Sequence, residues 1–222
     1  MKKRIAVIVI VFLVAAGGFL LIQWRGFSEP AAKQENAKVF SSSKAIIIPG
    51  WMQAVDHYKI YNGLDIWKDN IDPKEKIGSE YVIAHSLGVN FALINWQYNK
   101  NTKLILVNPV VPERNFGTAV GDWAATMGNE GFNPKEVVGG QYLASATGKA
   151  FKYSQIDPLE IMRKVPRNNL TVFCGSGDKF FCNSDSVKIM VENGINAIEI
   201  EGAGHDWSQK FDDEIEKIIN KE

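Results

Sequence analysis

This 222-residue chain has few cysteines, few histidines and no net charge. Its two cysteines, Cys174 and Cys182, are too few for a disulfide scaffold and lack the four-ligand spacing of a structural zinc site. Three histidines, His57, His85 and His205, offer little for a metal centre, so we expect neither a metal nor another cofactor. The 25 basic and 25 acidic side chains balance without a dense basic stripe, which argues against a nucleic-acid partner.

Internal repetition is also absent. Neither a G-x-y period nor a repeat of about 20–50 residues is visible, which excludes collagen and solenoid architectures. Hydrophobic residues make up 45% of the chain, as is ordinary for a folded protein. The length favours a single domain, with enough residues for a sizeable core.

The first 25 residues are typical of a membrane-targeting segment. Three basic residues precede residues 5–22, an uncharged apolar run of 18 residues. This length suits a membrane-spanning helix, whereas the apolar part of a secretory signal usually covers about 7–15 residues. The leading basic residues predict a cytoplasmic N-terminus. We therefore expect residues 1–25 to anchor the chain with its remainder outside the cytoplasm. Cleavage after Ala16, which would release a secreted protein, stays open.

The rest of the chain divides into a tether and a folded domain. Residues 26–42 are rich in small and polar side chains and are interpreted as a polar tether. Residues 43–222 alternate short apolar runs with helical patterns, which predicts a three-layer α/β domain with a mostly parallel sheet. Buried strands are expected at residues 44–49, 81–84, 103–108, 170–174 and 197–201. Helices are expected at residues 89–98, 185–193 and 207–220.

Residues 109–165 interrupt this alternation. They contain no clear strand and several aromatic side chains. A connection of this length is usually a functional lid or an inserted subdomain. We expect a lid in which Trp123 and Phe132 contact the substrate. The alternative is that these aromatic side chains form the core of the insert itself.

Residues 84–88, Ala-His-Ser-Leu-Gly, carry the strongest chemical signal. They nearly match the G-x-S-x-G turn between a strand and a helix, with Ala84 in place of the first glycine. Small residues on either side of Ser86 let the two backbones pass closely, and the strained turn projects the hydroxyl above the sheet. The motif is typical of a serine nucleophile.

A serine nucleophile needs a base to take its proton, and that base needs a carboxylate to orient it. Asp178 follows the predicted strand at 170–174, within Gly-Ser-Gly-Asp. His205 follows the predicted strand at 197–201, within Gly-Ala-Gly-His. Both side chains thus fall at carboxyl ends of strands, where the sites of open α/β sheets lie.

With these motifs the chain resembles the α/β-hydrolase superfamily over roughly residues 43–222. The matching pieces are residues 48–51, 84–88, 175–178 and 202–205. The resemblance implies that Ser86 is the nucleophile, Asp178 the acid and His205 the base. Adjacent loop residues rarely point at one atom, so Asp206 is disfavoured as the acid.

The resemblance also implies an oxyanion hole. Its first donor is the backbone N–H after the nucleophile, that of Leu87. Its second is the backbone N–H of Trp51, after an early strand. Pro49 stands where many members have histidine, so Met52 is the alternative donor, and we expect Met52 to touch the substrate as well. His85 is expected to pack or form a hydrogen bond beside the turn.

The resemblance implies a serine hydrolase that cleaves a small-molecule carboxylic ester or thioester through an acyl-enzyme. An acyltransferase or a peptidase on the same triad remains an alternative, as does a catalytically silent binding protein with this fold. The acyl chain, the leaving group and the oligomeric state stay open. So does the state of Cys174 and Cys182, which would pair only in an oxidising compartment.

Overall fold

The computed structural model describes residues 44–58, 61–111, 116–130 and 138–220. The predicted membrane segment and tether therefore lie outside the described residues. Within the described ranges, no helix combines the length and the apolar character that crossing a membrane requires.

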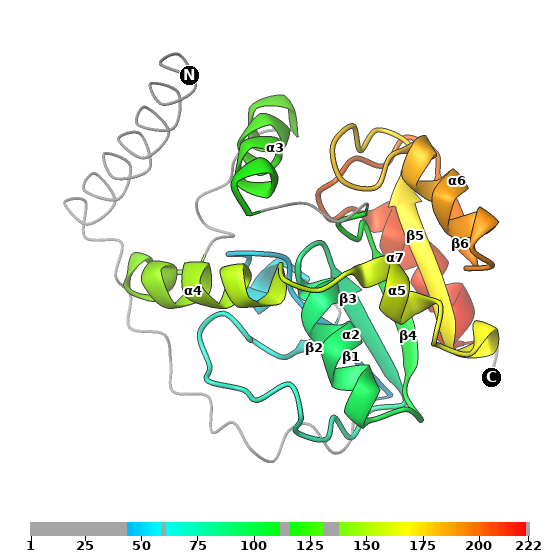
Figure 1. Ribbon diagram of the computed structural model, residues 1–222, viewed down its shortest axis with the longest axis horizontal. Helices are drawn as coiled ribbons and strands as arrows, with labels where there is room; N and C mark the ends of the chain where they lie inside the picture. The colour runs from blue at the N-terminus through cyan, green and yellow to red at the C-terminus, as the bar shows by residue number, and fades with distance from the viewer. Residues whose placement is uncertain (1–43, 59–60, 112–115, 131–137, 221–222) are drawn as a thin grey trace.

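A parallel sheet of six strands forms the centre of the domain (Figure 1). The strands lie in the order β2-β1-β3-β4-β5-β6, and all five neighbouring pairs are parallel. They are β1 (Ala45–Ile48), β2 (Asn62–Gly63), β3 (Tyr81–His85), β4 (Lys103–Val107), β5 (Leu170–Gly175) and β6 (Ala197–Ile200). The five predicted strands are β1 and β3 to β6, and the two-residue β2 is an addition at the edge.

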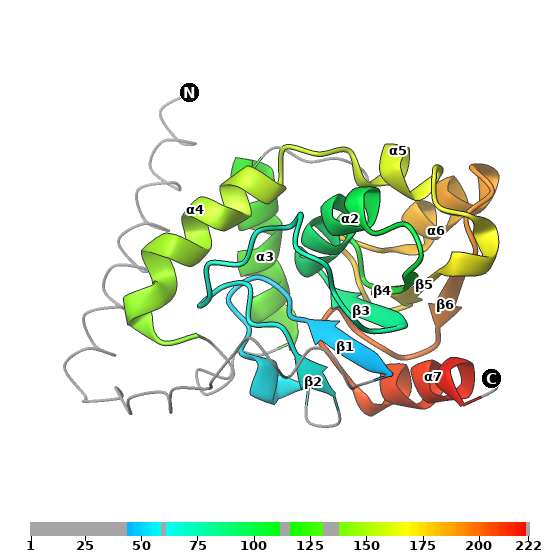
Figure 2. The same ribbon diagram turned by 90° about the horizontal axis from the view of Figure 1, so that it is seen from below.

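Helices cover both faces of the sheet, which confirms the predicted three-layer arrangement (Figure 2). One face packs against α2 (Gly88–Tyr98), α5 (Pro158–Met162) and α6 (Ser184–Glu192), and the other against α7 (Gln209–Ile219). The short 3-10 helices η2 (Val55–His57) and η5 (Arg167–Asn169) precede β2 and β5. The helices predicted from sequence correspond to α2, α6 and α7.

Burial on both faces explains why the strands are continuous apolar runs. In β1, Ile46 and Ile48 join the core beneath α2, whereas Ile47 points to the opposite face and joins the core beneath α7. Successive strand residues face opposite sides, so each strand supplies both cores. On α7, Phe211 and Ile215 are four residues apart and both are fully buried, as a single apolar helix face requires.

The predicted insert, residues 109–165, contains no strand in its described part. It forms α3 (Phe116–Glu130), η4 (Gly140–Tyr142), α4 (Leu143–Tyr153) and α5. Lys149 of α4 donates hydrogen bonds from Nζ to the carbonyl oxygens of Ile66 (2.9 Å) and Asp69 (2.7 Å), which ties α4 to the chain after β2. Phe132 lies outside the described residues.

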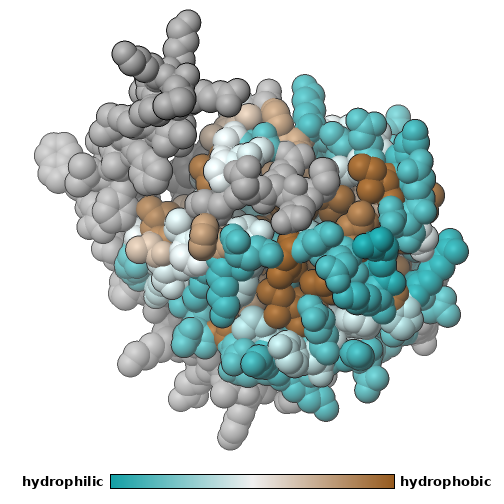
Figure 3. Space-filling model, in the orientation of Figure 1, coloured by the Kyte–Doolittle hydropathy of each residue, from teal (hydrophilic) through white to brown (hydrophobic). Residues whose placement is uncertain are grey.

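The surface is that of a folded domain with a buried core. In Figure 3, hydrophilic residues dominate the described part of the visible face, and smaller apolar patches show between them. Scattered apolar surface of this kind is normal, because polar side chains cannot cover a whole domain.

Candidate active site

The turn after β3 holds Ser86 in a strained conformation. Its φ of 51° lies in the left-handed region, which non-glycine residues rarely adopt. The Ser86 N–H donates to the carbonyl of Val107 (2.9 Å), and the Ser86 carbonyl accepts from Val89 N–H (3.1 Å). A Cβ atom on Gly88 would lie 2.3 Å from the carbonyl oxygen of Pro49, so only glycine fits there. The sequence motif therefore forms the sharp strand-to-helix turn that it predicts.

The structure brings Ser86, His205 and Asp178 together. Ser86 Oγ lies 2.9 Å from Nε2 of His205, and Nδ1 of His205 lies 2.7 Å from Oδ2 of Asp178. A carboxylate only accepts hydrogen bonds, so Nδ1 carries the ring proton and Nε2 is left to accept from the serine hydroxyl. Ser86 keeps 9% of its surface exposed and Asp178 only 1%. The three side chains come from the turns after β3, β6 and β5, respectively.

Asp178 sits in a loop whose backbone amides point at its carboxylate. Oδ1 accepts from the N–H groups of Phe180 (3.1 Å) and Phe181 (2.9 Å), and Oδ2 accepts from Cys182 N–H (3.0 Å). Burial raises the pKa of Asp178, but the hydrogen bonds from His205 and these amides outweigh it and hold the pKa below its ordinary value. The carboxylate is therefore ionised at neutral pH and fixed in orientation.

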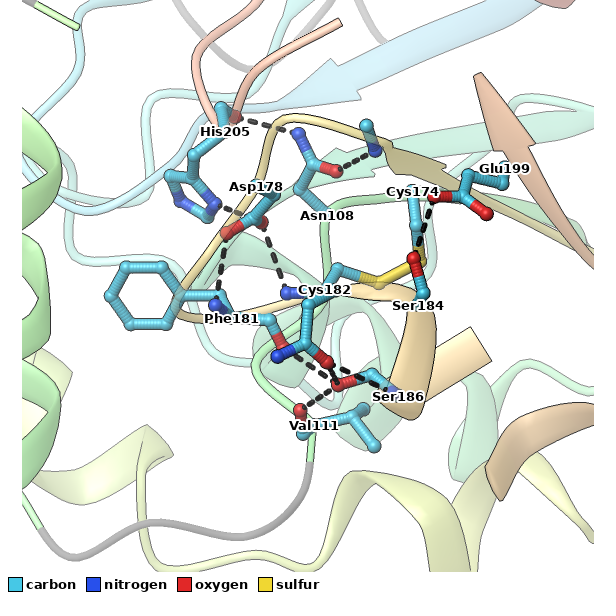
Figure 4. Close-up of a disulfide and its surroundings, with 12 residues drawn as sticks. Asn108, Val111, Cys174, Asp178, Phe181, Cys182, Ser184, Ser186, Glu199 and His205 are labelled. Atoms are coloured by element: carbon cyan, nitrogen blue, oxygen red, sulfur yellow. Dashed lines mark hydrogen bonds and ion pairs between the residues drawn. A yellow bond between two sulfur atoms is a disulfide. The ribbon is translucent and has the colours of Figure 1, made fainter. Parts of the chain in front are cut away.

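A disulfide between Cys174 and Cys182 closes the loop that carries Asp178 (Figure 4). Their Cα atoms lie 5.3 Å apart, and both residues are fully buried. The structure therefore has the bridge rather than two thiols. In the chain-entropy model, closing so short a loop stabilises the fold by roughly 2–3 kcal/mol. The bridge also fixes Cys182, whose N–H donates to Asp178.

The predicted oxyanion donors lie beside the nucleophile. Leu87 directly precedes α2, so its N–H belongs to the amino end of that helix. Trp51 and Met52 occupy the corners of the turn after β1, which the hydrogen bond from Gln53 N–H to the Gly50 carbonyl closes (3.0 Å). A Cβ atom on Gly50 would lie 3.2 Å from Cβ of Ser86, so this turn packs directly on the serine turn.

Met52 and Trp123, two of the predicted substrate contacts, connect the insert to this turn. The Met52 carbonyl accepts from Val138 N–H (2.7 Å), and Met52 has a left-handed φ of 63°. The ring of Trp123, on α3, lies 4.9 Å from the ring of Trp51 between centroids. The described part of the insert thus contacts the turn that carries the candidate oxyanion donors.

The position of the site follows from the strand order. The sheet grows in one direction from β1 to β2 and in the other from β3 to β6, so the order reverses between β1 and β3. In open α/β sheets the crevice at such a reversal, at the carboxyl ends of the strands, is where ligands bind. The Trp51 turn follows β1 and the Ser86 turn follows β3, so both lie at this crevice.

His85 forms hydrogen bonds beside the serine turn. Its Nε2 donates to the backbone carbonyl of His205 (2.8 Å), and its Nδ1 lies 2.8 Å from the Tyr58 hydroxyl. Complete burial, reinforced by the nearby His205, lowers the pKa of His85 to about 3. The backbone carbonyl of His205 needs a donor at Nε2, which fixes the tautomer of the neutral ring. Nδ1 lies 2.8 Å from Gln53 Oε1 as well as from the Tyr58 hydroxyl.

The lowered pKa of His85 predicts acid-sensitive stability. The unfolded chain binds a proton at His85 near the ordinary pKa of 6.5, whereas the folded chain does so only near pH 3. The free energy of unfolding should therefore fall as the pH drops below about 6.5, by up to about 1.4 kcal/mol per pH unit from this residue. Urea unfolding at pH 7 and pH 5 should show a loss in the wild type about 2 kcal/mol larger than in His85→Gln. Equal losses in both proteins would contradict the assignment.

Asp206, the acidic neighbour of the base, contacts Gln53, Trp207 and His57. Its Oδ1 accepts from Gln53 Nε2 (2.7 Å) and Trp207 N–H (2.8 Å), and it lies 3.2 Å from Nε2 of His57. Asp178, not Asp206, is therefore the carboxylate in contact with Nδ1 of His205.

Sequence reasoning missed Asn108, Gln53 and Tyr58, which form polar contacts around the base. Asn108 is fully buried directly after β4, and its side chain bonds to the loops of Asp178 and His205. An asparagine between a strand and a proline is an ordinary turn signal, so its role was not visible.

Within the described residues, no group of three or more His, Cys, Asp or Glu side chains could hold a metal ion.

Comparison with solved structures identifies the fold. A carboxylesterase from the ammonia-oxidizing Thaumarchaeon Nitrososphaera gargenis superposes with a TM-score of 0.54 at 14% identity, over 80% of this chain and 90% of that one. A thermophilic esterase from Thermogutta terrifontis gives 0.55 at 10% identity, over 82% and 89%. MGS-M2, an α/β hydrolase enzyme from a Medee basin deep-sea metagenome library, gives 0.54 at 10% identity, over 85% and 91%.

The protein therefore has the α/β-hydrolase fold, as its motifs predicted. No model of a protein family matches the sequence, and no curated protein is similar to it at a significant level.

Proposed function

We propose that this protein is a serine hydrolase that cleaves a carboxylic ester or thioester through an acyl-enzyme on Ser86. The observation that carries the proposal is the continuous chain of contacts from Ser86 Oγ to His205 Nε2 (2.9 Å) and from His205 Nδ1 to Asp178 (2.7 Å). This fold occurs in proteins of many different activities, so the proposal rests on the arrangement of these three side chains rather than on the fold.

In the proposed mechanism, His205 acts first as a base and then as an acid. Nε2 takes the proton of Ser86 as Oγ attacks the carbonyl carbon of the substrate. The negative charge that develops on the carbonyl oxygen is stabilised by the backbone N–H groups of Leu87 and Trp51. Collapse of this intermediate expels the alcohol or thiol, which takes the proton from Nε2 and leaves the acyl group on Ser86.

The second half of the reaction uses water in place of the serine. His205 takes a proton from water as the oxygen attacks the acyl-enzyme, and returns it to Ser86 Oγ as the carboxylic acid leaves. Asp178 stays ionised throughout, because its pKa is already held below its ordinary value and the positive charge of the transient imidazolium favours the carboxylate further. It stabilises the transient imidazolium and keeps Nε2 directed at the reacting atoms.

The solved structures of similar fold include esterases. Two of them are described as a carboxylesterase and an esterase. At 10–14% identity they bear on the fold, and the ester or thioester substrate is inferred from the site. An acyltransferase or a peptidase would use the same three residues and differ in the group that accepts or leaves.

A substrate panel tests this proposal. Purified protein is assayed with p-nitrophenyl esters, acyl thioesters and peptide amides. Hydrolysis of esters or thioesters well above that of amides is expected. Faster cleavage of amides would favour a peptidase. Turnover of none of the three classes would contradict hydrolysis and favour a binding protein.

We also propose that the insert selects the acyl group, because Trp123 contacts the Trp51 turn. Trp123→Ala should change the ratio of kcat/KM between short and long p-nitrophenyl esters by about tenfold, as removal of apolar surface from an acyl site does. Phe151→Ala, on the exposed face of α4, is the matched control and should leave the ratio unchanged. If Trp123→Ala lowered kcat/KM equally for esters of all acyl-chain lengths, the insert would not be selecting the acyl group.

We further propose that residues 1–25 anchor the protein in a membrane, with the hydrolase domain outside the cytoplasm. The disulfide supports this location, because such bridges persist in oxidising compartments. Cell fractionation should find the full-length chain in the membrane fraction. Full-length protein in the cytoplasmic fraction would contradict the proposal, and an intact mass lacking the first 16 residues would indicate secretion instead.

A further inference from the structure

Asn108 occupies a backbone position that few residues tolerate. It follows β4 directly, is fully buried and has a left-handed φ of 47°. Its N–H donates to the Phe173 carbonyl in β5 (2.8 Å). Asparagine is one of the few non-glycine residues that adopt this conformation at low cost. Its side chain is thereby directed across the carboxyl ends of the neighbouring strands.

The side-chain amide of Asn108 uses all its main hydrogen-bonding groups between two loops. Figure 4 shows its contact with His205. Nδ2 donates to the carbonyl oxygens of Gly204 (2.9 Å) and His205 (2.7 Å). Oδ1 accepts from Gly175 N–H, at the start of the loop that carries Asp178 (2.8 Å). The amide therefore connects the backbone of the candidate base to the loop of the candidate acid.

Val107, the residue before Asn108, contacts Ser86, the third member of the site. The Val107 carbonyl accepts the hydrogen bond of Ser86 N–H (2.9 Å). Val107 and Asn108 together thus contact the backbone around Ser86, Asp178 and His205. The side chain of Asn108 bonds directly to the loops of both the base and the acid.

We propose that Asn108 is a positioning residue, which holds the His205 backbone where its ring reaches both Ser86 and Asp178. The inference rests on the proposed hydrolase function. His205 must satisfy contacts of 2.9 Å and 2.7 Å on opposite sides of one ring, so a displacement of about 1 Å would break one of them.

The base loop needs such support. Gly202 and Gly204 precede His205, and Gly202 has a φ of 67°, so the backbone there is intrinsically permissive. The His205 carbonyl accepts two hydrogen bonds, from Asn108 Nδ2 (2.7 Å) and from His85 Nε2 (2.8 Å). The two loops also bond to each other directly, through Gly177 N–H to the Ala203 carbonyl (2.8 Å) and Gly202 N–H to Ser176 Oγ (2.8 Å). Of the two side chains that donate to the His205 carbonyl, only Asn108 also bonds to the acid loop, so its amide links the backbone of His205 itself to that loop.

Two substitutions separate this role from backbone strain. Asn108→Gly removes the amide but keeps a residue that adopts a left-handed φ freely. Asn108→Asp keeps the shape and the acceptor for Gly175, but replaces both donors by a carboxylate oxygen facing two carbonyls. Asn95→Ala is the matched control. Asn95 is also buried, and its Nδ2 donates to the carbonyls of Pro73 (2.7 Å) and Glu75 (2.8 Å), which belong to neither loop of the site.

A kinetic experiment on the full chain distinguishes positioning from simple stabilisation. Asn108→Gly should lower kcat for a p-nitrophenyl ester by about 10–100-fold with little change in KM, because a misplaced base slows chemistry more than binding. Asn95→Ala should keep kcat. The effect of Asn108→Gly should largely disappear in an Asp178→Asn background, since both changes act on the same contact. Unchanged kcat in Asn108→Gly, or the same loss in Asn95→Ala, would overturn the proposal.

A spectroscopic measurement does not depend on activity. The Nδ1 proton of a histidine that bonds to a buried carboxylate gives a far-downfield proton NMR signal. That signal should appear in the wild type and in Asn95→Ala, and be lost or broadened in Asn108→Gly and Asn108→Asp. If the Nδ1 proton signal is present in the wild type and lost in both Asn108 variants, but the wild type hydrolyses no substrate, the proposed function fails while the positioning role stands. If the wild type is active and both Asn108 variants keep the signal and kcat, the positioning role alone fails.

Discussion

Replacing Ser86 by alanine is expected to abolish ester hydrolysis while leaving the fold intact. The change removes only Oγ, the atom that lies 2.9 Å from His205 Nε2 and would carry the acyl group. Without that oxygen no acyl-enzyme forms, and only the oxyanion donors and substrate binding contribute to the rate. In a comparable serine triad, loss of the nucleophile lowers kcat on the order of 10⁶-fold, and we expect a loss approaching this.

The fold should tolerate the change because little packing is lost. Alanine meets the same left-handed strain at φ 51° as serine does. Ser79→Ala is a suitable control, since Ser79 is also buried and lies just before β3, whereas Ser86 follows it. Kinetics and thermal unfolding of both variants test the expectation. Wild-type activity in folded Ser86→Ala would mean that the nucleophile is elsewhere.

Asp178→Asn is expected to lower kcat by about 10⁴-fold, the loss that a wrongly oriented histidine causes in comparable triads. At this position an amide cannot replace the carboxylate. Oδ1 accepts from two backbone amides, those of Phe180 and Phe181, so the asparagine oxygen would take that side. Its NH₂ group would then face Nδ1 of His205 and favour the tautomer with the proton on Nε2. That tautomer cannot accept the proton of Ser86.

Asp206→Asn is the matched control for this prediction. It is the same chemical change one residue beyond the base, on a carboxylate that binds Gln53 and Trp207 rather than the His205 ring. Measurement of kcat for both variants should show a far larger loss in Asp178→Asn. If Asp206→Asn loses as much, or if Asp178→Asn stays within about tenfold of the wild type, the role of Asp178 is wrong.

The strands, and the candidate site residues that follow them, could be predicted wherever a short stretch of sequence is enough to identify them. Residues 82–84 (Val-Ile-Ala) and 104–107 (Leu-Ile-Leu-Val) are continuous aliphatic runs, and a parallel sheet buried on both faces needs just such runs. Asp178 and His205 were visible because each follows a predicted strand within a glycine-rich turn. The edge strand β2 was not, since Asn62 and Gly63 have low strand propensity and form a strand only by pairing with β1.

The contacts that support the base depend on tertiary structure and leave no local pattern. Gln53 and Tyr58 precede His85 by 32 and 27 residues, and they meet it because the turn after β1 packs on the turn after β3. The order of strands that brings these turns together is not encoded in any single segment. The cysteine pairing was likewise open from sequence, because spacing alone does not fix whether Cys174, near the end of β5, meets Cys182, in the loop before α6.

Mass spectrometry after treatment with a fluorophosphonate probe tests the central claim most directly. The probe reacts with activated serine nucleophiles and leaves a stable adduct on the oxygen that attacks it. We expect one adduct, on the peptide that contains Ser86, in the wild type and none at this position in Ser86→Ala. An unmodified wild-type protein, or an adduct on a different serine, would contradict the assignment of Ser86 as the nucleophile.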